Sequence, residues 1–265
     1  LRPAQGYSKH ARPRPLYTAK DAEAALERLD PAPFHRRIDL GGGVAATFLR
    51  AGHLLGAAQI RLEADGRAIH FSGDLGQADD PLMSPPEPFE GADVLVCEST
   101  YGDRSHPAID PETELAPILR RTFARGGTVL IASFAVGRAQ GLMLHISRLI
   151  RRGEIPPVPV YLNSPMAIDA TEIYRRHADE HRVSREDCMA MFRIAERVNT
   201  VDESKALNTR KGPMIIVSAS GMLTGGRILH HLVSFGPDRR NTILLAGFQA
   251  GGTRGEALAE GARSL

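Results

Sequence analysis

The sequence has 265 residues, with 33 basic and 31 acidic side chains, a formal net charge of +2, and 42% hydrophobic residues. This composition is typical of a globular protein and excludes a disordered chain, which would have fewer apolar residues and a larger net charge. Two cysteines are too few for a disulfide framework, so we expect a reducing, cytoplasmic location. The longest apolar run, at 128–136, is too short for a membrane span, and we expect no membrane partner.

The charge differs between the two parts of the chain. Residues 1–103 carry 11 basic and 15 acidic side chains, whereas residues 104–265 carry 22 basic and 16 acidic ones. This asymmetry is typical of a carboxylate-rich site beside a surface that binds a polyanion. A set of solvated, arginine-rich helices explains it equally well.

The first part of the sequence is predicted to form a sheet. A short amphipathic helix at 21–29 comes first, and strands are then expected at 44–50, 57–64 and 67–71, with a hairpin turn at Asp65-Gly66. The run at 92–97 is apolar throughout, which predicts a strand buried on both faces. No helix separates 44 from 83, and this favours an antiparallel or mixed sheet.

From about residue 104 onwards, strands alternate with helices of 10–15 residues. Helices are predicted at 111–125, 137–152, 165–180, 184–198 and 227–235, and strands at 128–134, 158–162, 214–218 and 242–246. Such alternation is typical of a parallel α/β layer. The predicted fold class is therefore α/β, with a sheet region in 1–103 and a parallel α/β domain in 104–265.

Three strand ends of the first part carry groups that can bind a metal. His53 follows the first of these strands between two glycines, Asp74 follows another, and Glu98 ends the apolar run. The separation of 21 residues between His53 and Asp74 is what one hairpin spans, so both side chains are expected at the same sheet edge. Imidazole and carboxylate groups are zinc ligands. Three ordinary strand-end turns are the alternative, because Asp and Gly favour turns.

Six motifs in series resemble the metallo-β-lactamase-fold nucleases that carry a β-CASP insertion, a group that includes RNA 3′-end-processing nucleases and their bacterial and archaeal counterparts. The motifs are GHLLG at 52–56, SGDLG at 72–76, ESTYG at 98–102, SFAVGRAQ at 133–140, NSPMA at 163–167 and SGMLTGGR at 220–227. The resemblance covers nearly the whole chain after residue 44. It implies a partial metallo-β-lactamase-like domain in 1–103 and a β-CASP domain in 104–265.

The resemblance implies a zinc-dependent nuclease that cleaves RNA as an endonuclease, and as an exonuclease too. It makes His53 a zinc ligand, Asp74 a catalytic aspartate that bridges two zinc ions, and Glu98 the catalytic acid of the family's motif A. A carboxylate in the place of Glu98 orients an imidazole and raises its basicity. Two metal ions would polarise a water molecule that attacks phosphorus. Because dimerisation is common in the family, a homodimer is a further expectation.

The sequence also departs from the family pattern. The His-x-His-x-Asp-His cluster that supplies most zinc ligands is absent before His53, and the histidines of motifs B and C do not follow Thr253. Two ligands cannot meet the three or four that zinc requires. We therefore expect the chain to be the central piece of a longer nuclease, truncated at both ends, with an incomplete ligand set and no activity alone.

The basic second part is expected to form one wall of an RNA-binding cleft. The predicted substrate-binding residues are Ser220, Gly221, Arg138, Arg227 and Ser164. Ser220 and Gly221 follow a strand and precede a helix, where backbone N–H groups bind phosphate readily. The alternative is that these glycines only permit a tight turn.

Other functional patterns are weak or absent. The segment 177–181 fits the metalloprotease pattern H-x-x-E-H but lies among arginines, where a solvated helix is expected. His230 and His231 are adjacent and diverge on a helix, so one of them is expected to face the core. Nucleotide-binding and serine-hydrolase motifs are missing. The two rival functions are a DNA-processing nuclease of the same family and a non-catalytic RNA-binding scaffold.

Overall fold

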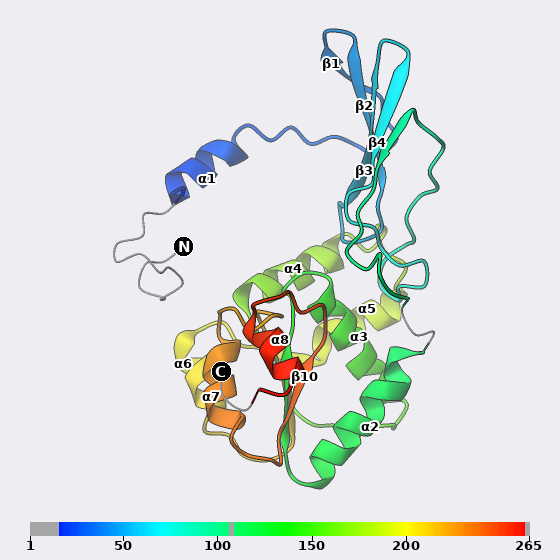
Figure 1. Cartoon of the computed structure of the whole chain (residues 1–265). Coiled ribbons are helices and arrows are strands. Elements are labelled where there is room, and N and C mark those ends of the chain that lie inside the picture. The colour runs from blue at the N-terminus through cyan, green and yellow to red at the C-terminus, as the bar shows by residue number, and fades with distance from the viewer. Residues whose placement is uncertain (1–15, 106–108, 263–265) are drawn as a thin grey trace.

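The computed structural model describes residues 16–105 and 109–262, which form two five-stranded sheets (Figure 1). The strands of the first sheet are β1 (Ile38–Gly41), β2 (Val44–Arg50), β3 (Ala58–Ala64), β4 (Arg67–Phe71) and β5 (Val94–Val96), in that spatial order. All neighbours pair antiparallel except β4 and β5, which are parallel. The predicted mixed sheet is confirmed. Because β2, β4 and β5 run in the same direction, their carboxyl ends lie along one edge.

Strand β5 differs from its prediction. Its three residues, Val94, Leu95 and Val96, are 47–48% exposed, and Cys97 beyond them is exposed as well. The prediction that this apolar strand is buried on both faces was wrong. An apolar run favours burial, but β5 is an edge strand of this sheet and its side chains stay about half exposed.

The second sheet is entirely parallel, with the spatial order β10-β6-β9-β7-β8, and it confirms the predicted parallel α/β layer. Its strands are β6 (Thr128–Ala132), β7 (Val160–Asn163), β8 (Ala195–Arg197), β9 (Met214–Ser218) and β10 (Thr242–Leu245). The helices around it are α2 (Pro111–Ala124), α3 (Arg138–Arg151), α4 (Pro165–Arg176), α5 (Arg185–Arg193), α6 (Val201–Leu207), α7 (Ile228–Phe235) and α8 (Arg254–Ala259).

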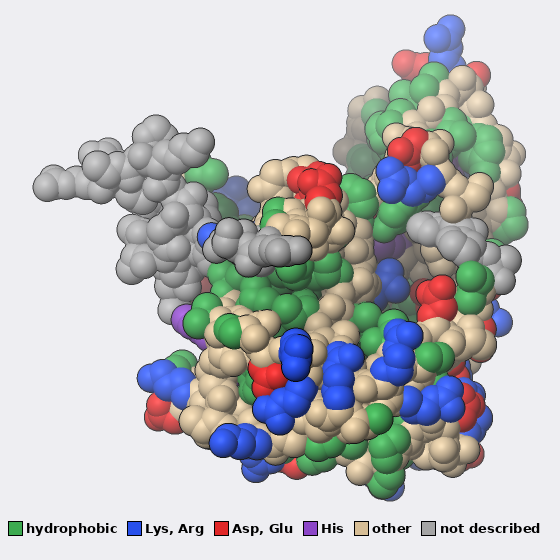
Figure 2. Space-filling view, turned by 60° about the horizontal axis from the view of Figure 1, so that its bottom comes forward, with side chains coloured by type: hydrophobic (Ala, Val, Ile, Leu, Met, Phe, Trp, Pro, Cys, Tyr) green, Lys and Arg blue, Asp and Glu red, His purple; other side chains and the backbone are tan. Residues whose placement is uncertain are grey.

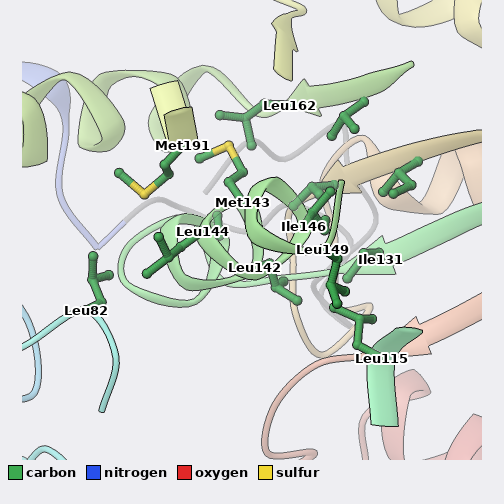
Figure 3. Close-up of a cluster of buried hydrophobic side chains, with 14 of the residues drawn as sticks. Leu82, Leu115, Ile131, Leu142, Met143, Leu144, Ile146, Leu149, Leu162 and Met191 are labelled. Atoms are coloured by element: carbon green, nitrogen blue, oxygen red, sulfur yellow. The ribbon is translucent and has the colours of Figure 1, made fainter. Parts of the chain in front are cut away.

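Alternate residues of this sheet face two hydrophobic cores. Val129 and Ile131 of β6 belong to the larger core, which they share with α2, α3, α4 and α5 (Figure 3). Leu130 and Ala132 belong to the smaller core, which contains residues of α6 and α7. The second part is thus a three-layer α/β/α domain whose central strands are buried on both faces, as near-continuous apolar runs require.

Several elements were predicted with different bounds or were not predicted at all. The predicted helix 184–198 is the helix α5 followed by the short edge strand β8, and the predicted helix 165–180 ends at Arg176. Strand β1 and helices α6 and α8 were not predicted. The short strand β8 has a polar sequence, Ala-Glu-Arg, which carries no strand signal of its own.

Helix α1 (Ala19–Leu26) lies apart from both sheets in Figure 1, and it has no buried residue. Thr18 and Asp21 form a capping box that satisfies backbone N–H groups at its start. No helix among the described residues is both long and apolar enough to cross a membrane.

The two parts of the chain pack against each other through a loop of the first. Leu82 and Met83 are buried in the larger core of the second domain, and the backbone N–H of Arg182 donates to the Leu82 carbonyl at 3.1 Å. Arg50 of β2 donates to Glu180 at 2.9 Å. The domain boundary at 103/104 stays a prediction, since residues on either side of it share this core.

Candidate functional site

The loops that carry His53 and Asp74 are joined by their backbones. Gly52 forms an antiparallel bridge with Leu75, and the N–H of Gly76 donates to the Ala51 carbonyl at 2.8 Å. His53 and Asp74, each beside a bridge residue, are both exposed. The structure therefore brings the predicted imidazole and carboxylate to one sheet edge.

A glycine makes this close approach of the two loops possible. A Cβ added to Gly76 would overlap the carbonyl of Gly52. Any other residue at position 76 would push the two loops apart, and His53 would move away from Asp74 with its loop. The glycine of the SGDLG motif is thus a packing requirement of the site.

Glu98 lies at the same edge, at the end of β5. Its Oε1 accepts a hydrogen bond from the backbone N–H of Leu75 at 2.8 Å, and its Oε2 accepts from that of Thr100 at 3.2 Å. These hydrogen bonds and the nearby His53 hold the pKa of the Glu98 carboxyl below its ordinary value, against the opposing effect of burial. Glu98 is therefore a fixed, ionised carboxylate close to His53.

The His53 loop also contacts the second domain. Gly137, at the start of α3, has a φ of +76°, and a Cβ added there would overlap the side chain of Leu54. Arg138 follows directly and is exposed. The loop that carries His53 is therefore packed against the corner that presents Arg138.

A second contact joins the loop after β5, here called the Glu98 loop, to the loop between β9 and α7, here called the Ser220 loop. The ring of Tyr101 packs against that of Phe248 with centroids 5.7 Å apart. Gln249, the next residue, donates from Nε2 to the carbonyl of Gly221 at 3.1 Å. Residues 247–249 therefore link the Glu98 loop to the Ser220 loop.

The Ser220 loop is a tight turn between β9 and α7. The Ser220 Oγ accepts a hydrogen bond from the Thr224 N–H at 3.1 Å, and the Ile228 N–H donates to the Ala219 carbonyl at 3.2 Å. Gly221 is buried, and a Cβ there would lie 2.9 Å from the ring of Phe134. The glycine therefore has a packing role, whether or not the loop binds phosphate.

Ser164 and Arg227 have structural partners. The Ser164 hydroxyl caps α4 by accepting from the Ala167 N–H at 3.3 Å, and the residue is buried. The Arg227 guanidinium donates to Asn163 Oδ1 at 2.8 Å and to the carbonyls of Val198 and Asn199. Their substrate contacts stay predictions, but the structure uses both side chains internally.

The structure also shows the surroundings of the adjacent pair His230-His231 and of the H-x-x-E-H segment. His231 is fully buried, as expected for one residue of the pair, whereas His230 is exposed. The segment 177–181 does not form the expected solvated helix, because α4 ends at Arg176 and His181 is buried, with Nε2 3.2 Å from the Tyr174 carbonyl oxygen. The H-x-x-E-H pattern is therefore structural.

The described residues do not by themselves fit a zinc ion. Zinc requires three or four protein ligands, and within 16–105 and 109–262 no group of three or more His, Cys, Asp or Glu side chains could hold a metal. His53 and Asp74 offer one imidazole and one carboxylate, while two backbone amides already occupy Glu98. A metal here would need further ligands.

Residues 139–258 match the Beta-Casp domain family. A ribonuclease of Thermus thermophilus is 38% identical over 91% of this chain, and an RNase J-like protein of Methanocaldococcus jannaschii is 35% identical over 94%. An endoribonuclease of Schizosaccharomyces pombe is 32% identical over 90% of the chain.

The chain spans 57%, 59% and 32% of the lengths of these three relatives. The two sheets have the predicted arrangement. Residues 139–258 therefore belong to the β-CASP domain family, and the chain as a whole is similar over nine tenths of its length to proteins named as ribonucleases.

Proposed function

We propose that the protein containing this chain is a metal-dependent hydrolase that cleaves RNA phosphodiester bonds. One observation carries this proposal: the edge bearing His53, Asp74 and Glu98 meets the Arg138 corner and, through Phe248 and Gln249, the Ser220 loop. Relatives named as ribonucleases and endoribonucleases support RNA as the substrate. The family supports metal dependence, and two zinc ions are the proposed cofactor.

The chain's own residues have three proposed roles. His53 and Asp74 contribute two of the metal ligands, and the remaining ligands must come from residues other than the described set. The ionised Glu98 carboxylate orients His53. Arg138 and the backbone N–H groups at Ser220 and Gly221 bind phosphate oxygens of the RNA. A homodimer and a cytoplasmic location stay predictions.

The test uses the complete gene product that contains this chain, with a labelled RNA and a DNA of the same sequence. We expect Asp74→Ala to abolish RNA cleavage while the Kd for RNA changes by no more than about twofold, since a ligand to the metal acts mainly in the chemical step. Asp79→Ala removes another exposed carboxylate, five positions further along the chain, and should leave cleavage intact.

The alternatives give different results. Undiminished cleavage by Asp74→Ala would overturn the assigned site. RNA binding without any cleavage by the unaltered protein would support a scaffold, and preferential cleavage of DNA would support a DNA-processing nuclease.

A further inference from the structure

Three neighbouring strands of the second sheet begin next to basic residues. In the parallel sheet, Thr242 of β10 is in register with Val129 of β6, and Thr128 of β6 with Met214 of β9. Each of these strands is preceded, within four positions, by one or two basic residues: Arg125 before β6, Arg210 and Lys211 before β9, and Arg239 and Arg240 before β10. Adjacent strands lie about 4.8 Å apart, so the three loops are neighbours.

Hydrogen bonds join these three loops. The Thr128 N–H donates to Asn241 Oδ1 at 2.8 Å, and the Thr128 hydroxyl donates to the Gly212 carbonyl at 3.2 Å. The Arg125 guanidinium donates to the Arg240 carbonyl at 2.5 Å and to Thr242 Oγ1 at 2.7 Å. The loops therefore present their charges from a fixed framework. Arg121, one turn before Arg125 on α2, adds a further exposed cation.

The basic rim consists of Arg121, Arg125, Arg210, Lys211, Arg239 and Arg240. Asp238, the carboxylate within the same loops, pairs with Arg240 at 2.7 Å. In the described part of the chain, the side chains of Arg121, Lys211 and Arg239 have neither an ion pair nor a hydrogen bond. Figure 2, which brings the lower end of Figure 1 forward, shows Lys and Arg side chains gathered over this end of the second domain.

The basic rim lies at the opposite end of the sheet from the Ser220 loop. The rim precedes β9, whereas Ser220 follows it, and the five residues of β9 alone separate the two ends by about 13 Å at a rise of ~3.3 Å per residue. Cations at the rim therefore do not act in the candidate site. They form a separate basic surface at the amino-terminal end of the parallel sheet.

We propose that the basic rim binds the phosphate backbone of an RNA segment lying outside the cleft. The proposal rests on the proposed function, because that function makes RNA the polyanion this protein meets. Several exposed cations without carboxylate partners match a chain of phosphates, and guanidinium groups offer paired donors to each phosphate. Binding would be independent of sequence, since phosphate contacts carry no base information.

The test measures binding of a labelled single-stranded RNA of about 30 nucleotides to the chain across a salt series. For Lys211→Ala/Arg239→Ala, we expect the Kd near 0.1 M salt to rise about tenfold. The positive slope of log Kd against the logarithm of the salt concentration should fall by about 1.4, or ~0.7 per lost phosphate contact. Arg36→Ala/Arg67→Ala removes two other exposed cations, from the first part of the chain, and should leave both values unchanged.

A second measurement needs no variant. Bound RNA should protect Lys211 from acetylation by a water-soluble reagent but leave Lys20 on α1 reactive. Equal losses of affinity in the two double variants, or an unprotected Lys211, would overturn the proposal. The proposal would also be overturned if the unaltered chain bound phosphatidylserine vesicles and not RNA, and if the rim substitutions abolished that vesicle binding. Because cleavage is not measured, failure of the rim is distinct from failure of the proposed activity.

Discussion

The rings of Tyr101 and Phe248 meet edge to face, with centroids 5.7 Å apart and planes at 89°. Tyr101 lies three residues after Glu98 in the first part of the chain, and Phe248 lies three residues after the end of β10 in the second. This pair fixes the Glu98 loop against the loop that contacts Gly221.

A double-mutant cycle measures what this contact contributes. With Tyr101→Leu, Phe248→Leu and the double variant, we expect a coupling of about 0.5–1.5 kcal/mol in the free energy of unfolding, the range found for aromatic pairs. Urea denaturation provides the measurement. Additive effects of the two substitutions would show that the rings do not hold the loops together.

Substitution of Gly137 should be destabilising for two reasons. Gly137→Ala places a Cβ on a backbone with φ of +76° and against the side chain of Leu54, so we expect a loss of about 1–3 kcal/mol. Adding Leu54→Ala should relieve the overlap but not the backbone strain, and the loss should be partly recovered.

Gly141 provides a matched control four residues further along α3. A Cβ there meets nothing within 4 Å, so Gly141→Ala should stabilise the chain by about 0.5–1 kcal/mol through helix propensity. Thermal denaturation of both variants is the measurement. Similar effects at the two positions would show that Leu54 does not pack on Gly137.

Glu112 connects α2 to α3 through buried charge. The residue is 5% exposed, and its carboxylate binds His145 Nδ1 at 2.8 Å and the guanidinium of Arg152. Glu112→Gln removes the charge and leaves these partners, so we expect a loss of about 2 kcal/mol, less than for a fully buried pair because Arg152 is 47% exposed.

Glu114 is the matched control, since it lies in the same first turn of α2 and is exposed. Glu114 also interacts with the helix dipole but has no buried partner among the described residues, so Glu114→Gln should cost less than about 1 kcal/mol. Urea denaturation at neutral pH compares the two. Equal losses would show that the buried network contributes nothing beyond the dipole.

Much of the fold could be predicted from the sequence because hydrophobic patterns are local. The predicted bounds of β2, β4 and β9 agree with the structure, since each strand is a clear run ended by turn residues. The pattern could not show that β5 is exposed, because burial depends on which other segments cover a strand. It also missed β8, whose polar residues lie at a sheet edge.

The candidate site, too, could be predicted only in part from the sequence. Glycine-flanked strand ends indicated that His53 and Asp74 share an edge, because strand direction determines where such ends lie. The sequence could not show that the guanidinium of Arg227 is directed to Asn163, since that contact joins α7 to β7 across 64 residues. Motif membership indicates importance, but it does not separate substrate contact from internal support.

The buried imidazole of His231 should make stability depend on pH. His231 is fully buried, with Nε2 2.5 Å from Asn163 Nδ2 and Nδ1 2.6 Å from Asn208 Oδ1, and burial lowers its pKa to about 4. In the unfolded chain its pKa is near 6.5. Between these values the unfolded state binds a proton that the folded state does not, so stability falls as the pH drops from 6.5 to 4.

His231→Gln removes this titration while keeping a side chain that forms hydrogen bonds. Relative to the variant, the unaltered chain should lose about 2 kcal/mol of unfolding free energy between pH 7 and pH 5, as the two pKa values require. Urea denaturation at several pH values provides the measurement, with His230→Gln as the control for loss of an exposed imidazole. If the curves of the unaltered chain and His231→Gln run parallel from pH 7 to pH 5, His231 is not held neutral by burial, and the network through Asn163 does not depend on an uncharged imidazole.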